Sequence, residues 1–103
     1  MADLQVSGRW VAHQSNGFDV DFDLKQTGGT LHGSASHRGG SVDGDIPSGE
    51  VSRSGFHVVV LWRNGSRGDY SGTIGNDGRL HGLTFDVDNH QSQANWFSDK
   101  HFR

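Results

Sequence analysis

Residues 18–25 are the most regular stretch of the chain and restrict the fold more than any other feature. They read Phe-Asp-Val-Asp-Phe-Asp-Leu-Lys, so apolar and charged side chains alternate with a period of two. In a β-strand this pattern gathers the apolar side chains on one face and the charged ones on the other. In an α-helix the apolar groups would be scattered around the cylinder, and Asp is a poor helix former. The stretch is therefore a β-strand whose dry face must be covered by the rest of the chain.

Similar alternating segments recur along the chain, separated by short turns rich in Gly and Asn. The turn signals return about every 8 to 12 residues, which is typical of antiparallel hairpins. The predicted strands cover residues 7–14, 18–25, 30–36, 41–46, 56–63, 69–74, 80–87 and 94–100. Loops are predicted at residues 37–40 and 88–93, and Pro47-Ser48-Gly49 is predicted to interrupt the fourth strand before an edge segment at 51–54.

Eight short strands in a chain of 103 residues predict a single all-β domain spanning residues 1–103. The 16 Gly residues disfavour helix, and the turns leave no room for crossover helices. We therefore expect an eight-stranded antiparallel up-and-down meander that closes into a barrel, with a two-sheet sandwich as the alternative. Glycines at the centres of inward faces, namely Gly33, Gly44, Gly72 and Gly82, favour the tightly curved barrel.

Charge and composition narrow the classes of partner. The net charge is −3 and Lys and Arg are spread thinly, so no basic surface for nucleic acid is expected. The sequence has no Cys, which removes disulfides and thiolate metal sites. The N-terminus lacks the apolar run of a signal peptide and no stretch is long enough to span a membrane. No membrane partner is therefore expected, and the cytoplasm is the default location.

In an up-and-down barrel, alternate strands run in opposite directions, so each inward residue can be assigned to one end. We call the end where the first strand begins the lower end. Inward residues there are mostly large and apolar, namely Trp10, Leu24, Leu31, Ile46, Phe56, Ile74 and Leu80. The upper end combines aromatic and polar side chains, namely Gln14, Phe18, Ala35, Val42, Trp62, Tyr70, Thr84, Asp86 and Trp96.

This upper mouth is predicted to bind a small molecule, because such sites combine apolar surface with a few orienting polar groups. The stacking area would come from Phe18, Trp62, Tyr70 and Trp96. The orienting groups would be Gln14, Thr84 and Asp86. Two alternatives remain at this point. The rings can merely cap the core, or they can stack on a sugar, as in a lectin.

The segment Gly8-Arg9-Trp10 resembles the opening strand of the calycin superfamily, and the strands around Trp62 and Tyr70 are similar to a strand pair of the avidin and streptavidin family. The resemblance implies a barrel with a pocket at its upper end and a dimer or tetramer. It implies that Trp62 is a pocket Trp, with Tyr70 and Thr84 near two further Trp positions. It also assigns polar ligand positions to Gln14 and Ser15.

Two residues depart from the avidin pattern or match it poorly. Ala35 stands where the avidins have a Tyr, and Asp99 is an imperfect match to their buried Asp. These departures, together with Tyr70 and Thr84 in place of two Trp residues, argue against biotin as the ligand.

No catalytic residue, metal ligand or cofactor is predicted. The seven His residues show no ligand spacing, and by strand parity His32, His57 and His81 point outward. A catalytic set of His37, Asp86 and Ser15 can be written down, but no nucleophile motif supports it. A small barrel enzyme or a protein inhibitor therefore stays open as a third class of function.

Apolar residues also occupy outward positions on the fifth and seventh strands. Because these strands flank the sixth, the side chains are expected to form one exposed patch, and such patches usually mark an interface. The sequence thus predicts a homodimer through Val59, Leu61, Leu83, Phe85 and Val87.

Overall fold

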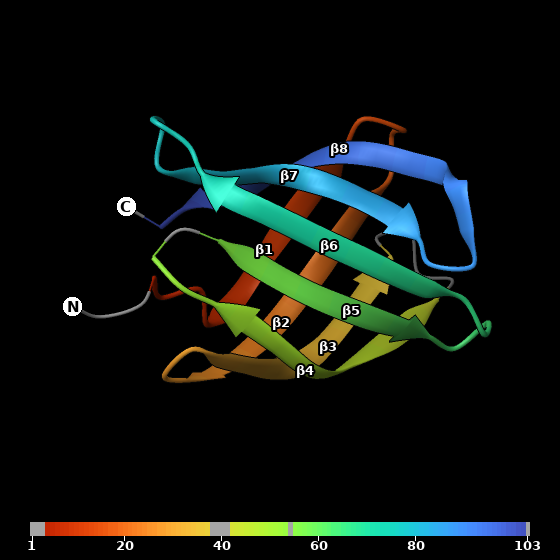
Figure 1. Cartoon of the computed structure of the whole chain (residues 1–103), viewed down its shortest axis with the longest axis horizontal. Helices are drawn as coiled ribbons and strands as arrows, with labels where there is room; N and C mark the ends of the chain where they lie inside the picture. The colour runs from red at the N-terminus through yellow and green to blue at the C-terminus, as the bar shows by residue number, and fades with distance from the viewer. Residues whose placement is uncertain (1–3, 38–41, 54, 103) are drawn as a thin grey trace.

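The computed structural model describes residues 4–37, 42–53 and 55–102. Eight antiparallel strands follow one another around a closed barrel, each paired with its neighbour in sequence and β8 paired with β1 (Figure 1). The strands are β1 (Gly8–Gln14), β2 (Asp19–Thr27), β3 (Thr30–His37), β4 (Asp43–Val51), β5 (Phe56–Trp62), β6 (Arg67–Ile74), β7 (Arg79–Asp86) and β8 (Asn89–His101). This confirms the predicted fold class and excludes the two-sheet sandwich.

Two inward glycines allow the barrel to close tightly. A side chain at Gly33 would overlap the carbonyl oxygen of Asp23 on β2, and one at Gly82 would overlap the carbonyl oxygen of Ser71 on β6. The backbones of neighbouring strands therefore approach more closely at these points than any other residue allows. Gly33 also has φ of 154° and lies where the pairing of β3 with β4 shifts register. The strong curvature predicted from these positions follows from this close approach.

The fourth strand is longer than predicted, because Pro47 lies inside β4 and does not end it. The pairing of β4 with β5 shifts register between Asp45 and Gly49, which is the signature of a bulge. Pro has no N–H to donate, and a bulge accommodates it without loss of a ladder hydrogen bond. The predicted interruption at 47–49 is therefore wrong. Residues 38–41 and 54, part of a predicted loop and of the predicted strand ends, lie outside the described residues.

The last strand is also longer than predicted, because β8 begins at Asn89 where a loop was expected. The turn before it is short, and the carboxylate of Asp86 accepts a hydrogen bond from the Asp88 N–H at 2.9 Å. Pairing shifts from Phe85–Gln93 to Asp86–Asn89, so β8 carries extra residues in a bulge. Side chains 89–93 are all exposed. The segment therefore has no alternation of apolar and polar residues from which a strand could have been predicted.

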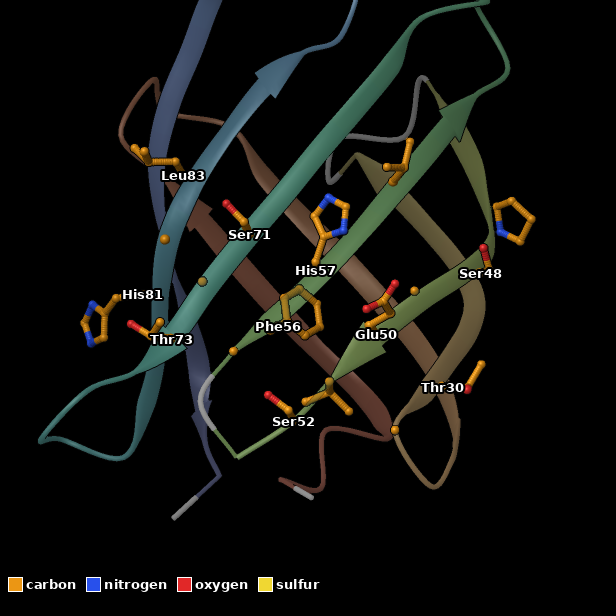
Figure 2. Close-up of a pocket in the computed structure, with 18 residues that line it drawn as sticks. Thr30, Ser48, Glu50, Ser52, Phe56, His57, Ser71, Thr73, His81 and Leu83 are labelled. Atoms are coloured by element: carbon orange, nitrogen blue, oxygen red, sulfur yellow. The ribbon is translucent and has the colours of Figure 1, made fainter. Parts of the chain in front are cut away.

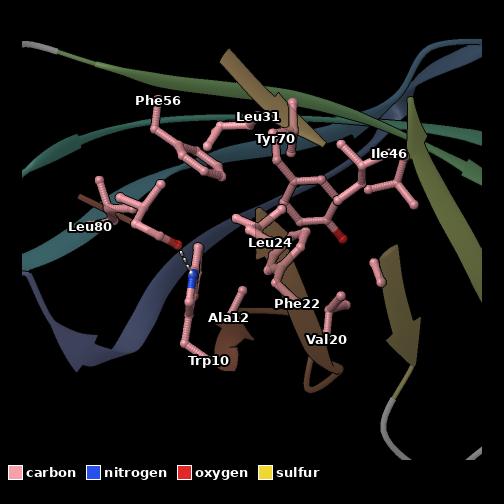
Figure 3. Close-up of a cluster of buried hydrophobic side chains, with 14 of the residues drawn as sticks. Trp10, Ala12, Val20, Phe22, Leu24, Leu31, Ile46, Phe56, Tyr70 and Leu80 are labelled. Atoms are coloured by element: carbon pink, nitrogen blue, oxygen red, sulfur yellow. Dashed lines mark hydrogen bonds between the residues drawn. The ribbon is translucent and has the colours of Figure 1, made fainter. Parts of the chain in front are cut away.

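Aromatic rings fill the lower and middle barrel around Trp10 (Figure 3). The Trp10 ring centroid lies 4.9 Å from that of Phe22 and 5.7 Å from that of Phe56. Its indole N–H donates to the carbonyl oxygen of Val6 at 3.0 Å, and Val6 is fully buried. The segment before β1 thus closes the lower end. Of the residues predicted for that end, Ile74 is half-buried and the others are buried: Trp10, Leu24, Leu31, Ile46, Phe56 and Leu80.

Candidate functional site

A cavity of about 200 Å³ opens at the upper end of the barrel, where β1, β5 and β7 finish and β2 and β6 begin. The strands reverse direction at each turn, so residues far apart in the sequence meet at this end. The structure brings together six of the seven predicted site residues in the cavity lining, namely Gln14, Phe18, Trp62, Tyr70, Thr84 and Asp86. Strand parity and strand direction were sufficient to group them.

Trp96 does not belong to this mouth. It is 2% exposed, and its ring centroid lies 6.0 Å from that of Trp10 and 5.7 Å from that of Phe56. Gly72 explains the difference, because a side chain there would lie 3.0 Å from the Trp96 ring. The missing side chain leaves space that the indole fills. The structure therefore places Trp96 in the core and outside the cavity lining.

His37 lines the cavity and was missed as a site residue. It was expected in a loop, but it is the last residue of β3 and continues the inward series of Leu31, Gly33 and Ala35. Its ring centroid lies 4.6 Å from that of Trp62 and 5.6 Å from that of Phe18. Burial lowers the pKa of His37, which favours the neutral imidazole. Extending the alternation of β3 by one step would have found it.

A directed chain of hydrogen bonds crosses the mouth, and one backbone group fixes its polarity. The Phe18 N–H can only donate, so the Asn16 side-chain atom 3.2 Å away is its oxygen. That oxygen also accepts from the Gln14 side-chain amide at 3.2 Å. The remaining Gln14 atom is therefore its carbonyl oxygen, which accepts from the Tyr70 hydroxyl at 2.6 Å. The chain thus runs from Tyr70 through Gln14 to Asn16.

Tyr70 remains a hydrogen-bond donor under all physiological conditions. Burial raises the pKa of Tyr70 to about 12, and a hydrogen bond with Thr84 opposes this shift. The phenol therefore stays protonated, and both ends of the Tyr70–Gln14 contact keep their roles. This arrangement orients side chains and does not supply a base.

The rim on the β6 and β7 side carries charge of both signs. Arg67 and Asp86 line the cavity. The Arg67 guanidinium donates to the Asp88 carboxylate at 2.7 Å. This hydrogen bond is the main cause that raises the pKa of Arg67 and lowers that of Asp88. The positive charge of Arg67 is thus already balanced, and Asp86 adds hydrogen-bond acceptors to the cavity.

Ser15, a ligand position implied by the avidin resemblance, and Asp99, compared there with a buried Asp, both lie outside the mouth. The Ser15 hydroxyl accepts from the Asn95 N–H at 3.0 Å and lines a separate cleft on the outer wall. Asp99 is exposed on the outer wall, where its carboxylate accepts from the Val11 N–H at 2.8 Å. The catalytic set of His37, Asp86 and Ser15 is also not assembled, since Ser15 is absent from the lining of the mouth.

The five outward apolar residues predicted to form a patch lie on β5, on β7 and directly after β7, but Arg67 and Asp69 of β6 lie between the two groups. Leu61 is 42% exposed and Leu83 is 50% exposed, and the other three members of the patch are half-buried. Beside them lies an open groove of about 1140 Å³, whose floor includes the small residues Ser71 and Thr73. Figure 2 shows Leu83 along one border of this groove and Thr30 of β3 along the other.

Histidines on the outer wall pair with carboxylates. His57 lies 2.7 Å from Asp69, and His81 lies 3.0 Å from Asp77. Within residues 4–37, 42–53 and 55–102 no group of three or more His, Asp or Glu side chains is placed to hold a metal ion. In the same part of the chain no helix is long and apolar enough to cross a membrane.

Comparison with known proteins adds no family to this description. No protein-family model matches the chain, and no curated protein matches it. The function must therefore be inferred from the geometry of the site.

Proposed function

We propose that this protein is a non-catalytic binding protein that holds a small molecule in the upper mouth of the barrel. The observation that carries the proposal is the cavity of about 200 Å³. The rings of Phe18, His37, Trp62 and Tyr70 line this one space together with a directed chain of polar groups. Small-molecule sites commonly have this combination of apolar surface and a few convergent polar groups, and barrel mouths commonly hold them.

The chemistry of the lining supports binding over catalysis. The raised pKa of Tyr70 keeps its phenol protonated, and its hydroxyl is engaged by Gln14. A nucleophile needs a base within hydrogen-bond reach. Ser15, the nucleophile of the set considered above, lies outside the lining. Side chains that hold each other in place favour recognition of a fixed shape.

The test is a fragment screen by ¹H–¹⁵N NMR with wild-type protein and the Trp62→Ala variant. Fragments no larger than a single sugar ring with its substituents should shift the Trp62 indole signal in the wild type. Trp62→Ala should abolish these shifts, because it removes the largest ring of the lining. Phe97→Ala is the matched control, since Phe97 is an exposed ring on the outer side of β8.

The stability of each variant must be measured by urea unfolding before its binding is compared. Binding that is unchanged in folded Trp62→Ala would reject the mouth as the site. So would a screen in which no fragment perturbs the mouth signals of the wild type.

We also propose that the β5–β7 wall packs against a second copy of the chain. The exposed Leu83 lines the groove together with Val59, Ser71 and Thr73, and the exposed Leu61 follows Val59 by two residues on the same strand. A twofold axis lying across β6 would place the projecting side chains of each copy over the groove of the other, as an isologous interface requires. The expected mass by light scattering at micromolar concentration is twice 11.2 kDa. A mass of 11.2 kDa would refute the dimer.

A further inference from the structure

We propose that the ligand of the mouth is a neutral polyhydroxy compound the size of one monosaccharide ring. This inference rests on the proposed function and adds to it the chemical class of the ligand. Four features of the lining carry it, namely its volume, the direction of its hydrogen bonds, its charge balance and its rings.

The volume sets the size. A cavity of about 200 Å³ is smaller than the pockets of about 300–1,000 Å³ that hold drug-sized ligands. At about 30 Å³ of liquid volume for each water, it corresponds to about seven waters. One six-membered ring with its hydroxyl groups is of this order. A disaccharide can therefore place only one of its rings inside.

The direction of the hydrogen bonds sets the chemistry. The Asn16 oxygen is used twice, by the Phe18 N–H and by the Gln14 amide. The Gln14 oxygen is used by the Tyr70 hydroxyl. The N–H groups of both amides that are left over, two on Asn16 and one on Gln14, can therefore donate to a ligand, and the Gln14 oxygen keeps one lone pair. The Asp86 carboxylate on the other side of the lining only accepts. A ligand that fits must accept on one side and donate on the other, and a hydroxyl group does both.

The charges of the lining disfavour an anionic ligand. Arg67 is neutralised by Asp88 at 2.7 Å, so no free cation is present in the described lining to hold an anion. Asp86 accepts from the Asp88 N–H at 2.9 Å through one carboxylate oxygen, which leaves the other oxygen to accept from a ligand hydroxyl group. His37 has a lowered pKa, so its ring adds no fixed positive charge at neutral pH.

The rings supply the apolar side of such a site. Phe18, His37 and Trp62 form a connected group, with centroid distances of 5.6 Å and 4.6 Å between successive rings. Phe18 is 55% exposed, so part of this group is open to solvent at the rim. A sugar ring has a face of C–H groups that packs against aromatic surface, while its hydroxyl groups remain free for the polar side.

The experiment compares three panels of probes by ¹H–¹⁵N NMR titration. The first contains the methyl glycosides of glucose, galactose and mannose. The second contains cyclohexanol and tetrahydropyran, which have a similar size but at most one hydroxyl group. The third contains benzoate and benzylammonium. At least one glycoside should bind, with shifts in the Trp62 indole and in the side-chain amides of Gln14 and Asn16. Both comparator panels should bind at least tenfold more weakly.

A double variant, Gln14→Leu with Tyr70→Phe, separates polar recognition from shape. Replacing both partners of a hydrogen bond by apolar groups of similar shape has little effect on stability, so the barrel should stay folded. Glycoside affinity should fall by about tenfold or more, since the orientation of the Asn16 amide is lost with its partner. Cyclohexanol affinity should not fall.

The outcomes distinguish this inference from the proposed function. Mouth shifts with cyclohexanol, benzoate or benzylammonium and none with glycosides would overturn the sugar class and leave a small-molecule site. Glycoside binding that is unchanged in the double variant would also overturn it. An absence of mouth shifts with every probe of the three panels and of the fragment screen would overturn both proposals.

Discussion

Ser98 is expected to hold together the lower part of the β7–β8 pair, and Ser98→Ala tests this directly. Pairing of β7 with β8 shifts register between Arg79 and His81, so the regular ladder is broken there. The Ser98 hydroxyl accepts from the Leu80 N–H at 3.0 Å and donates to the Lys100 carbonyl oxygen at 2.7 Å. Ser98 and Leu80 are both fully buried. The side chain thus substitutes for missing backbone hydrogen bonds inside the core.

The expected loss of stability follows from the two backbone groups that Ser98→Ala leaves without a side-chain partner. The Leu80 N–H would be buried without an acceptor, which costs about 1–3 kcal/mol in the free energy of unfolding. Lys100 is exposed, so water can replace the donor to its carbonyl oxygen at little cost. A loss of about 2 kcal/mol lowers Tm by about 8–16 °C in a domain of this size. With a slope of about 2 kcal/mol per molar, the urea midpoint falls by about 1 M.

The assay is urea unfolding followed by tryptophan fluorescence and circular dichroism, with agreement of the two probes as the check of two-state behaviour. Ser34→Ala is the matched control, because Ser34 is exposed on β3 and its loss should change stability by no more than about 0.5 kcal/mol. A Ser98→Ala variant as stable as this control would refute the role of the hydroxyl.

Three further predictions concern the backbone, pH and the outer wall. Gly82→Ala should lower the free energy of unfolding by about 1–3 kcal/mol or more, because the added methyl group would overlap the Ser71 carbonyl oxygen. Gly55→Ala is the control and should be nearly neutral, since the nearest atom to its methyl group would be 3.6 Å away. Because the pKa of His37 is lowered in the folded protein, the unfolded state binds more protons as the pH falls. The contribution of His37 to the free energy of unfolding is therefore complete above the unfolded pKa of 6.5 and is lost as the pH falls below it. His37→Phe should therefore reduce the rise of the urea midpoint between pH 5 and 7.5, and an unchanged slope would contradict this. Leu83→Asp should halve the mass measured by light scattering, and a wild-type mass in the variant would exclude the β5–β7 wall as the interface.

The barrel and most of its mouth were predictable because alternation with a period of two carries two kinds of information. Along residues 18–25 it identifies the strand and also its buried face. The direction of each strand then assigns every inward residue to the upper or the lower end of the barrel. This assignment correctly grouped Trp62 from β5 with Gln14 from β1. Each step uses only local pattern and strand order, and closure of the sheet preserves both.

The features that were not predicted depend on the volume available next to other strands and on backbone pairing between residues with exposed side chains. The displacement of Trp96 into the core depends on the empty volume over Gly72, which lies on another strand and is not encoded near residue 96. The early start of β8 at Asn89 is held by backbone pairing whose side chains are all exposed, so no apolar pattern marks it. His37 differs from both, since its inward position follows from the β3 alternation and only the adjacent loop signal obscured it.

The lower end of the barrel is closed by Val6 and the Trp10 side chain, which restricts how a ligand could enter the site that we propose. A cavity with a single opening does not let a chain pass through it. Only the end of a longer chain could enter the cavity, and it would leave through the same opening. If the ligand of the proposed site is part of a polymer, the site would therefore bind the terminal unit and not an interior one.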